Sequence, residues 1–300
     1  MPTADSTRRE GRGDAINGRH RGLDRTENFV AGFGALADLA LGGAQVSARA
    51  VDLSTGKVLL SVDDSLVLPT ASIGKVLLLL EVSARIGNGT SSRYDILDRE
   101  PVDYAADSGI WQHLSAPSFP LADLAALVAS TSDNLATNVL LRRVGLDSVR
   151  LRAEEIGIRR TALLDRVRDR RGPDDAPQLS VGSAEELTWL FGALARGELI
   201  DPATSYRVVD WLMLGMDLSL VAAAFGLDPL AHSRPDHNLT LFNKTGTDQG
   251  VRAEAGVLRG PRASVAYAVT LVFQDRRIDD RLEAIGAMRT IGTDLLEYVH

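Results

Sequence analysis

The chain has 300 residues, enough for two average domains or one compound domain, and its 45% hydrophobic and 24% charged residues are typical of a globular protein. Its formal net charge of −7 at pH 7 argues against a nucleic-acid binder that works by counterion release. The absence of cysteine excludes disulfides, thiolate metal sites and a thiol nucleophile, and no apolar run is long enough to span a membrane.

The first predicted element is a polar arm. Residues 1–24 are rich in Gly and Arg and have no apolar periodicity, which predicts disorder. They contain no apolar core of a secretory signal, so we expect a cytoplasmic protein. From Glu27, apolar residues recur at helical spacing as far as the Gly pair at 42–43. Two strand patterns, 45–53 and 57–62, then predict a hairpin.

A long helical block follows. After Pro69, the segment 72–87 is apolar on nearly every face, which predicts a buried central helix. Further helical patterns lie at 121–131, 133–143, 147–157, 184–196 and within 202–227. An irregular loop rich in Arg, Asp, Gly and Pro interrupts them at 158–182. Three strand patterns, at 239–243, 251–258 and 265–273, precede a final helix from about Asp279.

The order of these elements predicts the fold class. Strands so far apart in the sequence most readily share one antiparallel sheet, with the helical block inserted as a second lobe. We therefore predict an α+β fold with a five-stranded antiparallel sheet, flanking terminal helices and an inserted all-helical lobe. The α/β lobe would comprise residues 25–68 and 237–300, and the helical lobe residues 69–236.

The few lysines draw attention to one motif. Only three lysines accompany 30 arginines, and lysine, unlike arginine, can lose its proton in a buried site. In the Ser-x-x-Lys motif at 72–75, Ser72 and Lys75 share a helix face, and apolar surroundings favour Lys75 as a proton acceptor. The structural alternative is a helix N-cap and a surface lysine. The same pattern at 54–57 lies in a predicted hairpin turn and serves as a decoy.

Two further motifs offer complementary groups. In the Ser-Asp-Asn motif, the Ser132 hydroxyl can pass a proton to a leaving nitrogen and the Asn134 amide can hold a carbonyl; the alternative is a helix N-cap. In the Lys-Thr-Gly motif, Lys244 and Thr245 can bind a carboxylate, and Gly246 permits close approach to a strand edge. The alternative there is a strand that ends in a glycine turn.

The order Ser-x-x-Lys, Ser-Asp-Asn, Lys-Thr-Gly resembles that of the serine β-lactamase and penicillin-recognising family, most closely class A. The resemblance runs from about residue 35 to the C-terminus and includes Leu-Asp-Arg at 164–166 and Gly-Val-Arg at 250–252. It implies a β-lactamase/transpeptidase-like fold and a serine hydrolase that forms an acyl-enzyme with a β-lactam or a related amide or ester.

The resemblance also implies roles for single residues. Ser72 would be the nucleophile, Lys75 the acylation base (a role disputed in class A), and Ser132 the proton donor to the leaving nitrogen. The backbone N–H groups of Ser72 and Thr247 would form the oxyanion hole. Lys244 would be the fourth catalytic residue, and with Thr245 and Arg252 it would hold the substrate carboxylate. The other substrate-binding positions would be Asn134, Gly246 and Thr247, with Tyr104 and Trp111 as an aromatic wall. Ordinary packing is the alternative for both aromatic residues.

The sequence departs from class A in the long loop. The position expected to hold the deacylating Glu holds Arg168, and arginine cannot act as a base near neutral pH. One hypothesis is that deacylation is slow or absent. The other is that Asp169, Asp174 or Asp175 replaces the missing Glu from a rearranged loop. We favour the first, because a shorter carboxylate would require the backbone to move inward by about one methylene.

Other functions and partners complete the predictions. A D-Ala-D-Ala-type peptidase or esterase, and a non-hydrolytic penicillin-binding or sensing protein, stay open as alternatives. No cofactor or metal is expected, since the histidines show no ligand spacing and no nucleotide fingerprint is present. We expect a monomer that binds a small-molecule substrate and neither nucleic acid nor membrane. The arginines in and beside the loop at 158–182 are either paired with its aspartates or recruit an anionic substrate.

Overall fold

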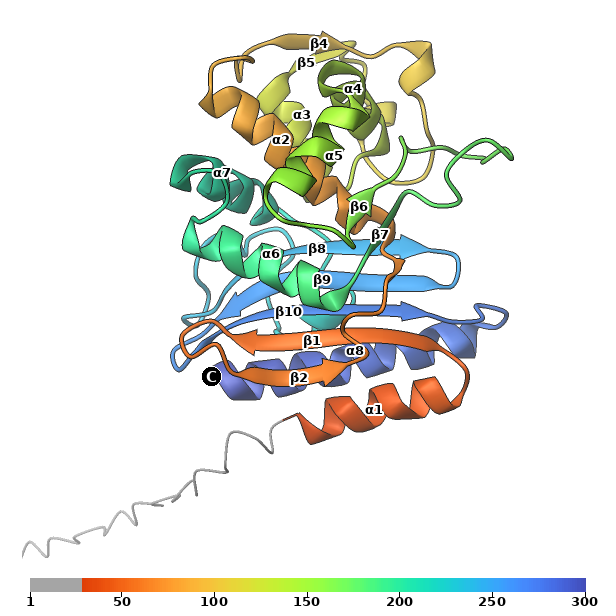
Figure 1. Ribbon diagram of the computed structural model, residues 1–300, viewed down its shortest axis with the longest axis vertical. Helices are drawn as coiled ribbons and strands as arrows, with labels where there is room; N and C mark the ends of the chain where they lie inside the picture. Colours follow the sequence, from red (N-terminus) through yellow and green to blue (C-terminus); the bar gives the residue numbers. More distant parts are fainter. Residues whose placement is uncertain (1–28) are drawn as a thin grey trace, which may run out of the picture.

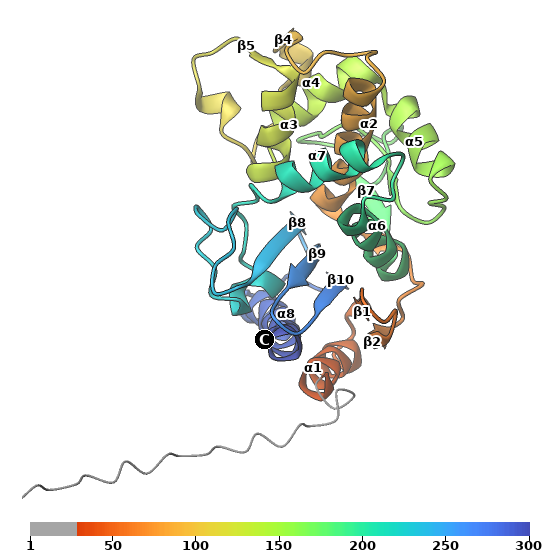
Figure 2. The same cartoon turned by 90° about the vertical axis from the view of Figure 1, so that its left-hand side faces the viewer.

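The computed structural model describes residues 29–300, so the arm predicted for residues 1–24 lies outside the described part of the chain. The larger sheet is antiparallel and has the strand order β2-β1-β10-β9-β8. Figures 1 and 2 show α1 and α8 on one face of this sheet and α6 with the rest of the helical lobe on the other. The sheet strands are β1 (Gln45–Asp52), β2 (Val58–Val62), β8 (Thr240–Asp248), β9 (Val251–Arg259) and β10 (Ser264–Val272). The predicted α+β fold with a five-stranded antiparallel sheet is confirmed.

Strand alternation explains how the sheet serves two cores. On β10, Tyr267, Val269 and Leu271 are fully buried toward α1 (Val30–Leu41) and α8 (Ile278–Val299). Their neighbours Ala266 and Ala268 are buried in the core shared with the helical lobe. Small residues on that face let α6 (Ala184–Arg196) pack directly on the sheet.

The helical lobe surrounds α2 (Lys75–Gly87), whose residues Leu77 to Leu80 are each at most 1% exposed. Since both faces of this helix are covered, the prediction of a buried central helix is confirmed. The surrounding helices are α3 (Leu121–Ser130), α4 (Asn134–Val144), α5 (Leu146–Glu155) and α7 (Pro202–Leu212). No helix among residues 29–300 is long and apolar enough to cross a membrane.

Two predicted boundaries at the motifs were wrong. Ser72 does not open the α-helix; it lies in a 3₁₀ turn, η1 (Ala71–Gly74), and α2 begins at Lys75. The strand predicted to end at residue 243 continues through the Lys-Thr-Gly motif, because Lys244, Thr245 and Gly246 all pair with β9. The Lys-Thr-Gly motif therefore lies on more regular backbone than its glycine suggests, whereas Ser72 lies on a turn rather than in the predicted α-helix.

Short strands and turns were not predicted, because two or three residues are too few to show alternation. A second sheet has the order β3-β7-β6, and β4 pairs with β5. These strands are β3 (Leu68–Pro69), β4 (Ile96–Asp98), β5 (Ser118–Pro120), β6 (Ala162–Leu163) and β7 (Ser180–Gly182). The remaining 3₁₀ turns are η2 (Pro101–Asp103), η3 (Trp111–His113) and η4 (Val221–Ala224).

Candidate active site

Ser72 is held on a braced turn between β3 and α2. Ala71 adopts the left-handed backbone region (φ +48°), which costs energy for a residue with a Cβ and therefore requires support. The support comes from Ser180, whose hydroxyl donates to the Ala71 carbonyl at 2.6 Å and lies 2.8 Å from the Thr70 hydroxyl. The Ser72 side chain is half-buried, so the turn presents it at the edge of the core.

Lys75 is 0% exposed, and its amine contacts the second motif. Its Nζ donates to the Ser132 carbonyl at 2.7 Å, the Asn134 Oδ1 at 2.8 Å and the Ser132 hydroxyl at 3.2 Å. Burial, reinforced by the positive charge of Lys244, holds the pKa of Lys75 well below its ordinary value, although Asp133 opposes the shift. The amine therefore loses its proton more readily than an ordinary lysine.

Hydrogen bonds of the next two residues, Asp133 and Asn134, hold the loop that carries Ser132. Ser132 has a left-handed backbone (φ +55°), and Asp133 is the N-cap of α4. The Asp133 carboxylate accepts three backbone hydrogen bonds of 2.8–2.9 Å, from Ala136, Ile110 and Trp111. The Asn134 amide donates to the Ala106 carbonyl at 2.6 Å, which leaves its oxygen for Lys75. The N-cap role thus belongs to Asp133, and Ser132 keeps its hydroxyl beside the lysine.

Gly246 brings the third motif against the nucleophile turn. A Cβ at this position would lie 2.1 Å from the Thr70 carbonyl oxygen and 3.2 Å from the Ser72 nitrogen. Only glycine permits this approach of two backbones. Because β8 is the edge strand of its sheet, Thr247 and its neighbours lie on the unpaired border beside Ser72.

Lys244 lies on the same strand and is 3% exposed. Its Nζ donates to the Thr245 carbonyl at 3.0 Å. Burial lowers the pKa of Lys244 to about 8, while the negative charges of Asp217 and Glu254 oppose the shift. At neutral pH Lys244 therefore keeps its proton, and its charge favours the neutral form of Lys75.

A cavity of about 340 Å³ joins the second and third motifs at the junction of the two lobes. Its lining includes Ser130, Ser132, Asp217, Asn243, Lys244 and Thr245. Together with the Lys75 contacts and the approach of Gly246 to Ser72, it brings the three separate motifs around one region. The surroundings combine hydroxyls, one ammonium and one carboxylate.

Trp111 does not line this region, so its assignment to an aromatic wall was wrong. The side chain is 0% exposed, packs edge-on against Phe119 with ring centres 5.3 Å apart, and donates from Nε1 to the Ala116 carbonyl. A side chain with no accessible surface cannot touch a substrate. Trp111 is therefore a packing residue in the core of the helical lobe.

Tyr104 and Arg252 have other surroundings. Tyr104 is 51% exposed, and the Arg99 guanidinium lies 5.9 Å from its ring centre. Arg252 is 6% exposed, and its NH1 donates to the carbonyls of Asp248 and Val251 in the β8–β9 turn. Tyr104 is therefore accessible to a ligand, whereas the Arg252 guanidinium is engaged by its own hairpin.

Ion pairs hold Arg168, the residue at the loop position where class A enzymes have the deacylating Glu. Arg168 contacts Asp165 at 2.7 Å and Asp175 at 3.0 Å, so Asp175 is engaged by a cation. Asp169 is exposed, and its Oδ1 accepts from the Ala106 nitrogen at 2.6 Å. Because Ala106 also accepts from Asn134, Asp169 is linked to the site through one residue.

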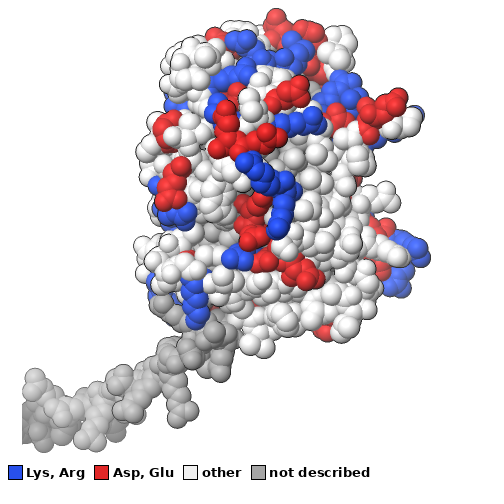
Figure 3. All heavy atoms as spheres, viewed as in Figure 1, with Lys and Arg blue, Asp and Glu red and all other residues white. Residues whose placement is uncertain are grey.

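The other loop arginines are largely paired as well. Arg171 contacts Asp165 at 2.7 Å, Arg160 contacts Glu185 at 3.1 Å, and Arg166 donates to the Val102 carbonyl. On the face shown in Figure 3, basic and acidic side chains lie next to one another rather than in separate regions. This arrangement favours the self-paired interpretation over a field that recruits anions.

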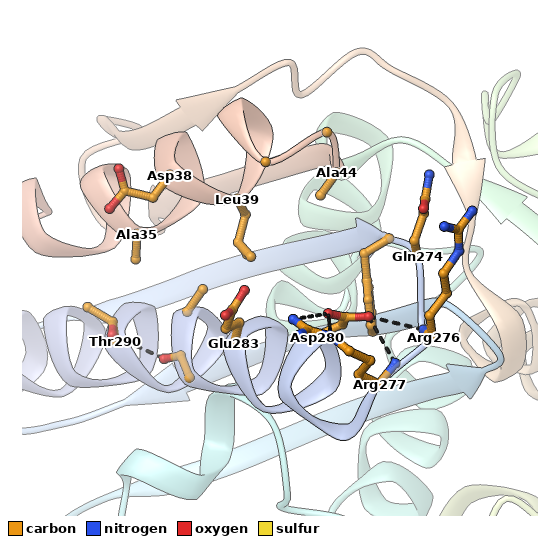
Figure 4. A pocket seen from close by; sticks show the side chains of 15 residues that line it. Ala35, Asp38, Leu39, Ala44, Gln274, Arg276, Arg277, Asp280, Glu283 and Thr290 are labelled. Carbon is orange, nitrogen blue, oxygen red and sulfur yellow. Dashed lines mark hydrogen bonds and ion pairs between the residues drawn. The ribbon is translucent and has the colours of Figure 1, made fainter.

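Among residues 29–300, no group of three or more His, Asp or Glu side chains is arranged to hold a metal. A larger cavity, of about 830 Å³, lies between α1 and α8 on the other side of the sheet (Figure 4). There Asp280 caps the start of α8 by accepting from the backbone nitrogens of Arg276 and Arg277. None of the three motifs contributes to its lining.

Sequence reasoning missed several groups at the site. Asp217 and the bracing residue Ser180 belong to no motif, and their neighbours are distant in the sequence. Glu254 on β9 is fully buried and accepts from Asn243 and Tyr267. One signal was present: a Glu within an otherwise apolar strand pattern is unusual and marks a buried polar partner.

Comparisons with known proteins agree with this architecture. The family model described as the β-lactamase enzyme family matches residues 34–299. Solved structures with the same fold include a β-lactamase from Sphaerobacter thermophilus, at 22% identity and TM-score 0.78, covering 90% of this chain and 97% of that chain. A PBP-A mutant, solved as an acyl-enzyme complex with penicillin-G, has 19% identity and TM-score 0.73, covering 89% and 95%.

A variant of the last common ancestor of Gram-negative bacterial class A β-lactamases has 20% identity and TM-score 0.71, covering 89% of this chain and 99% of that chain. No curated protein sequence matches the chain. At such identities the structural neighbours show the fold. The family match spans nearly all of the described residues and carries the assignment. The chain belongs to the β-lactamase enzyme family.

Proposed function

We propose that the protein is a class A β-lactamase-like serine hydrolase in which Ser72 forms an acyl-enzyme with a β-lactam or a related amide or ester. The observation that carries the proposal is the position of Lys75. Its fully buried amine has a lowered pKa and lies within 3.2 Å of the Ser132 hydroxyl, next to the Ser72 turn. Few structural roles require a buried lysine whose proton is easily lost.

Acylation would begin with transfer of the Ser72 hydroxyl proton to the neutral Lys75 amine as the oxygen attacks the substrate carbonyl. The Ser132 hydroxyl can both accept from Lys75 and donate to a leaving nitrogen, because a hydroxyl carries one proton and two lone pairs. The proton would then pass from Lys75 through Ser132 to that nitrogen as its bond to the carbonyl carbon breaks. The acyl group would remain on Ser72.

Backbone donors would stabilise the oxyanion. The Ser72 nitrogen faces the region of Gly246, and Thr247 follows on the unpaired border of β8. Two such N–H groups are each worth about 3–4 kcal/mol to a tetrahedral intermediate. Asn134 would hold the substrate carbonyl through the second N–H of its side-chain amide, since the other N–H donates to Ala106 and the oxygen accepts from Lys75.

Deacylation would be slow. Arg168 occupies the position expected for the base, and its ion pairs with Asp165 and Asp175 hold it there. Asp169 and Asp174 remain as candidate bases, but the Asp169 carboxylate is bound to the Ala106 nitrogen and Asp174 is exposed. A PBP-A mutant of the same fold was captured as an acyl-enzyme with penicillin-G, which supports the idea that this architecture holds such an adduct.

Intact-mass spectrometry after addition of benzylpenicillin or its methyl ester tests the proposal. We expect one adduct, absent in Ser72→Ala and retained in Ser54→Ala, which removes the hydroxyl of the exposed decoy motif. An adduct that lasts for hours supports slow deacylation. Rapid loss with product release would instead indicate that an aspartate of the loop, Asp169, Asp174 or Asp175, acts as the base, and no adduct with either compound would overturn the proposal.

A second candidate is a penicillin-binding protein without hydrolysis. The pairing of Arg168 favours it, because arginine cannot activate water and its ion pairs engage the carboxylates of Asp165 and Asp175. A chromogenic cephalosporin separates the two. Turnover that Ser72→Ala abolishes identifies a hydrolase, whereas labelling of Ser72 without turnover identifies a binding protein.

A further inference from the structure

Asp217 lies beside Thr245, one of the residues that the family resemblance assigns to a substrate carboxylate. It follows α7 in a segment that is tied to both lobes. The preceding Met216 nitrogen donates to the Ser130 carbonyl at 2.9 Å, and the Asn243 amide donates to the Asp217 carbonyl at 3.4 Å. The carboxylate is thereby placed beside β8 by backbone contacts on two sides.

The Asp217 carboxylate accepts a hydrogen bond from the hydroxyl of the third motif, that of Thr245. The Thr245 Oγ1 donates to the Asp217 Oδ2 at 2.7 Å, while Ser219 donates to Oδ1 through both its nitrogen and its hydroxyl. Among the described residues, no cationic side chain forms an ion pair with Asp217. Asp217 is therefore a carboxylate with neutral hydrogen-bond donors, and it lines the same cavity as Ser132 and Lys244.

This arrangement opposes an anionic ligand in two ways. The Thr245 hydroxyl has one proton, and that proton is already donated to Asp217. A second carboxylate at this position would also meet a like charge in a partly desolvated cavity, where repulsion is stronger than in water. A neutral group would meet neither obstacle.

The two nearby cations, Lys244 and Arg252, do not offset the repulsion between Asp217 and an anionic ligand. The Lys244 amine donates to the Thr245 carbonyl, and Arg252 donates to the carbonyls of Asp248 and Val251. Both are engaged by backbone oxygens of the hairpin. The positive charge of Lys244 is also opposed by Asp217 itself, which contributes to holding the lysine proton.

We propose that Asp217 is a specificity-determining residue, which selects neutral acyl donors over donors that carry a carboxylate beside the scissile amide or ester. The inference rests on the proposed function and names its substrate class. The carboxylate of the chain takes the place that the family resemblance assigns to the carboxylate of the substrate. The preferred substrates are then amides or esters with an uncharged group on that side.

A matched pair of compounds tests the proposal: benzylpenicillin, which carries the carboxylate, and its methyl ester. The quantity measured is the ratio of their second-order rates of Ser72 acylation. Asp217→Asn is expected to raise the benzylpenicillin-to-ester ratio roughly tenfold, because it removes one like charge in the cavity. Asp210→Asn is the control, since it removes the same charge from an exposed position on α7 that lines a different cavity.

A ratio that is equal in Asp217→Asn and in Asp210→Asn would overturn the proposal while leaving acylation by Ser72 intact. Binding to Ser72→Ala protein separates the two claims, because calorimetry there needs no acylation. Tighter binding of benzylpenicillin, relative to the ester, in Ser72→Ala/Asp217→Asn than in Ser72→Ala would support the role of Asp217 even if Ser72 were never labelled. An unchanged preference in that pair would contradict it.

Discussion

The amine of Lys75 lies 2.7 Å from the carbonyl oxygen and 3.2 Å from the hydroxyl oxygen of Ser132, although 57 residues separate them in the chain. The carbonyl accepts only, so it orients the amine. The hydroxyl can reverse its role as the amine gains or loses a proton. Both oxygens of Ser132 therefore contact Lys75, so one residue orients the amine and, in the proposed acylation, would offer it a path for the proton.

Lys75→Arg is expected to slow acylation of Ser72 by at least about a hundredfold, because arginine retains its proton. In the wild-type protein the acylation rate should reach its plateau far below the ordinary pKa of lysine, since burial and Lys244 lower the pKa of Lys75. Adduct formation followed by mass spectrometry from about pH 5 to pH 10 checks both points. Lys57→Arg, in the exposed decoy, should leave the rate unchanged. A rate that still rises near pH 10 would contradict the role of Lys75.

Gly246→Ala is expected to reduce acylation by about a hundredfold or more, because small displacements of a catalytic group have large effects. The added Cβ would lie 2.1 Å from the Thr70 carbonyl oxygen and push β8 from the Ser72 turn. Gly34→Ala is a matched control within α1, where a Cβ meets nothing within 4 Å and should stabilise the helix by about 0.5–1 kcal/mol. Adduct rates and thermal unfolding of both variants provide the measurement, and full activity of Gly246→Ala would show that the two backbones can separate.

The sequence could predict those parts of the fold that depend on long periodic patterns. The apolar run of α2 and the alternation of β10 both predicted elements whose buried faces the structure contains. The helix boundary at Ser72 could not be predicted in this way, because the left-handed Ala71 depends on the distant Ser180 for support. Propensity alone does not indicate such long-range support.

The candidate site shows the same division. Motif order singled out Lys75 and Ser132, which the structure brings into contact. It also assigned Trp111 to the substrate, because sequence spacing carries no information about burial. The position of Asp217 at the site could not be predicted, since its partner Thr245 lies 28 residues away and no spacing rule links a loop aspartate to an edge strand.

Arg168→Ala is expected to lower the free energy of unfolding by about 1–2 kcal/mol, because it leaves Asp165 and Asp175 without a shared cation. The loop should also become more sensitive to limited proteolysis. Arg170→Ala is the control, since that side chain is exposed, and its effect should stay within about 0.5 kcal/mol. Urea unfolding and protease digestion provide the measurements. Equal stability of the two variants would show that the ion pairs do not hold the loop.

Glu254 is expected to make the stability of the fold depend on pH. Burial raises its pKa from 4.5 to about 7, although hydrogen bonds from Tyr267, Asn243 and the Ala222 nitrogen oppose the shift. Between these two values the folded chain holds a proton that the unfolded chain releases. The free energy of unfolding therefore falls as pH rises through that range, by roughly 3 kcal/mol, and the contribution is constant above the higher value.

Glu254→Gln isolates this contribution, because glutamine does not titrate and any change in hydrogen bonding is the same at every pH. Urea unfolding of both proteins at about pH 5 and pH 8 gives the measurement. The stability of the wild-type protein relative to Glu254→Gln should be greater at the lower pH. Other titrating groups cancel in this difference, since both proteins share them. A difference that is the same at both pH values would mean that the buried carboxyl is ionised throughout, stabilised by the donors around it.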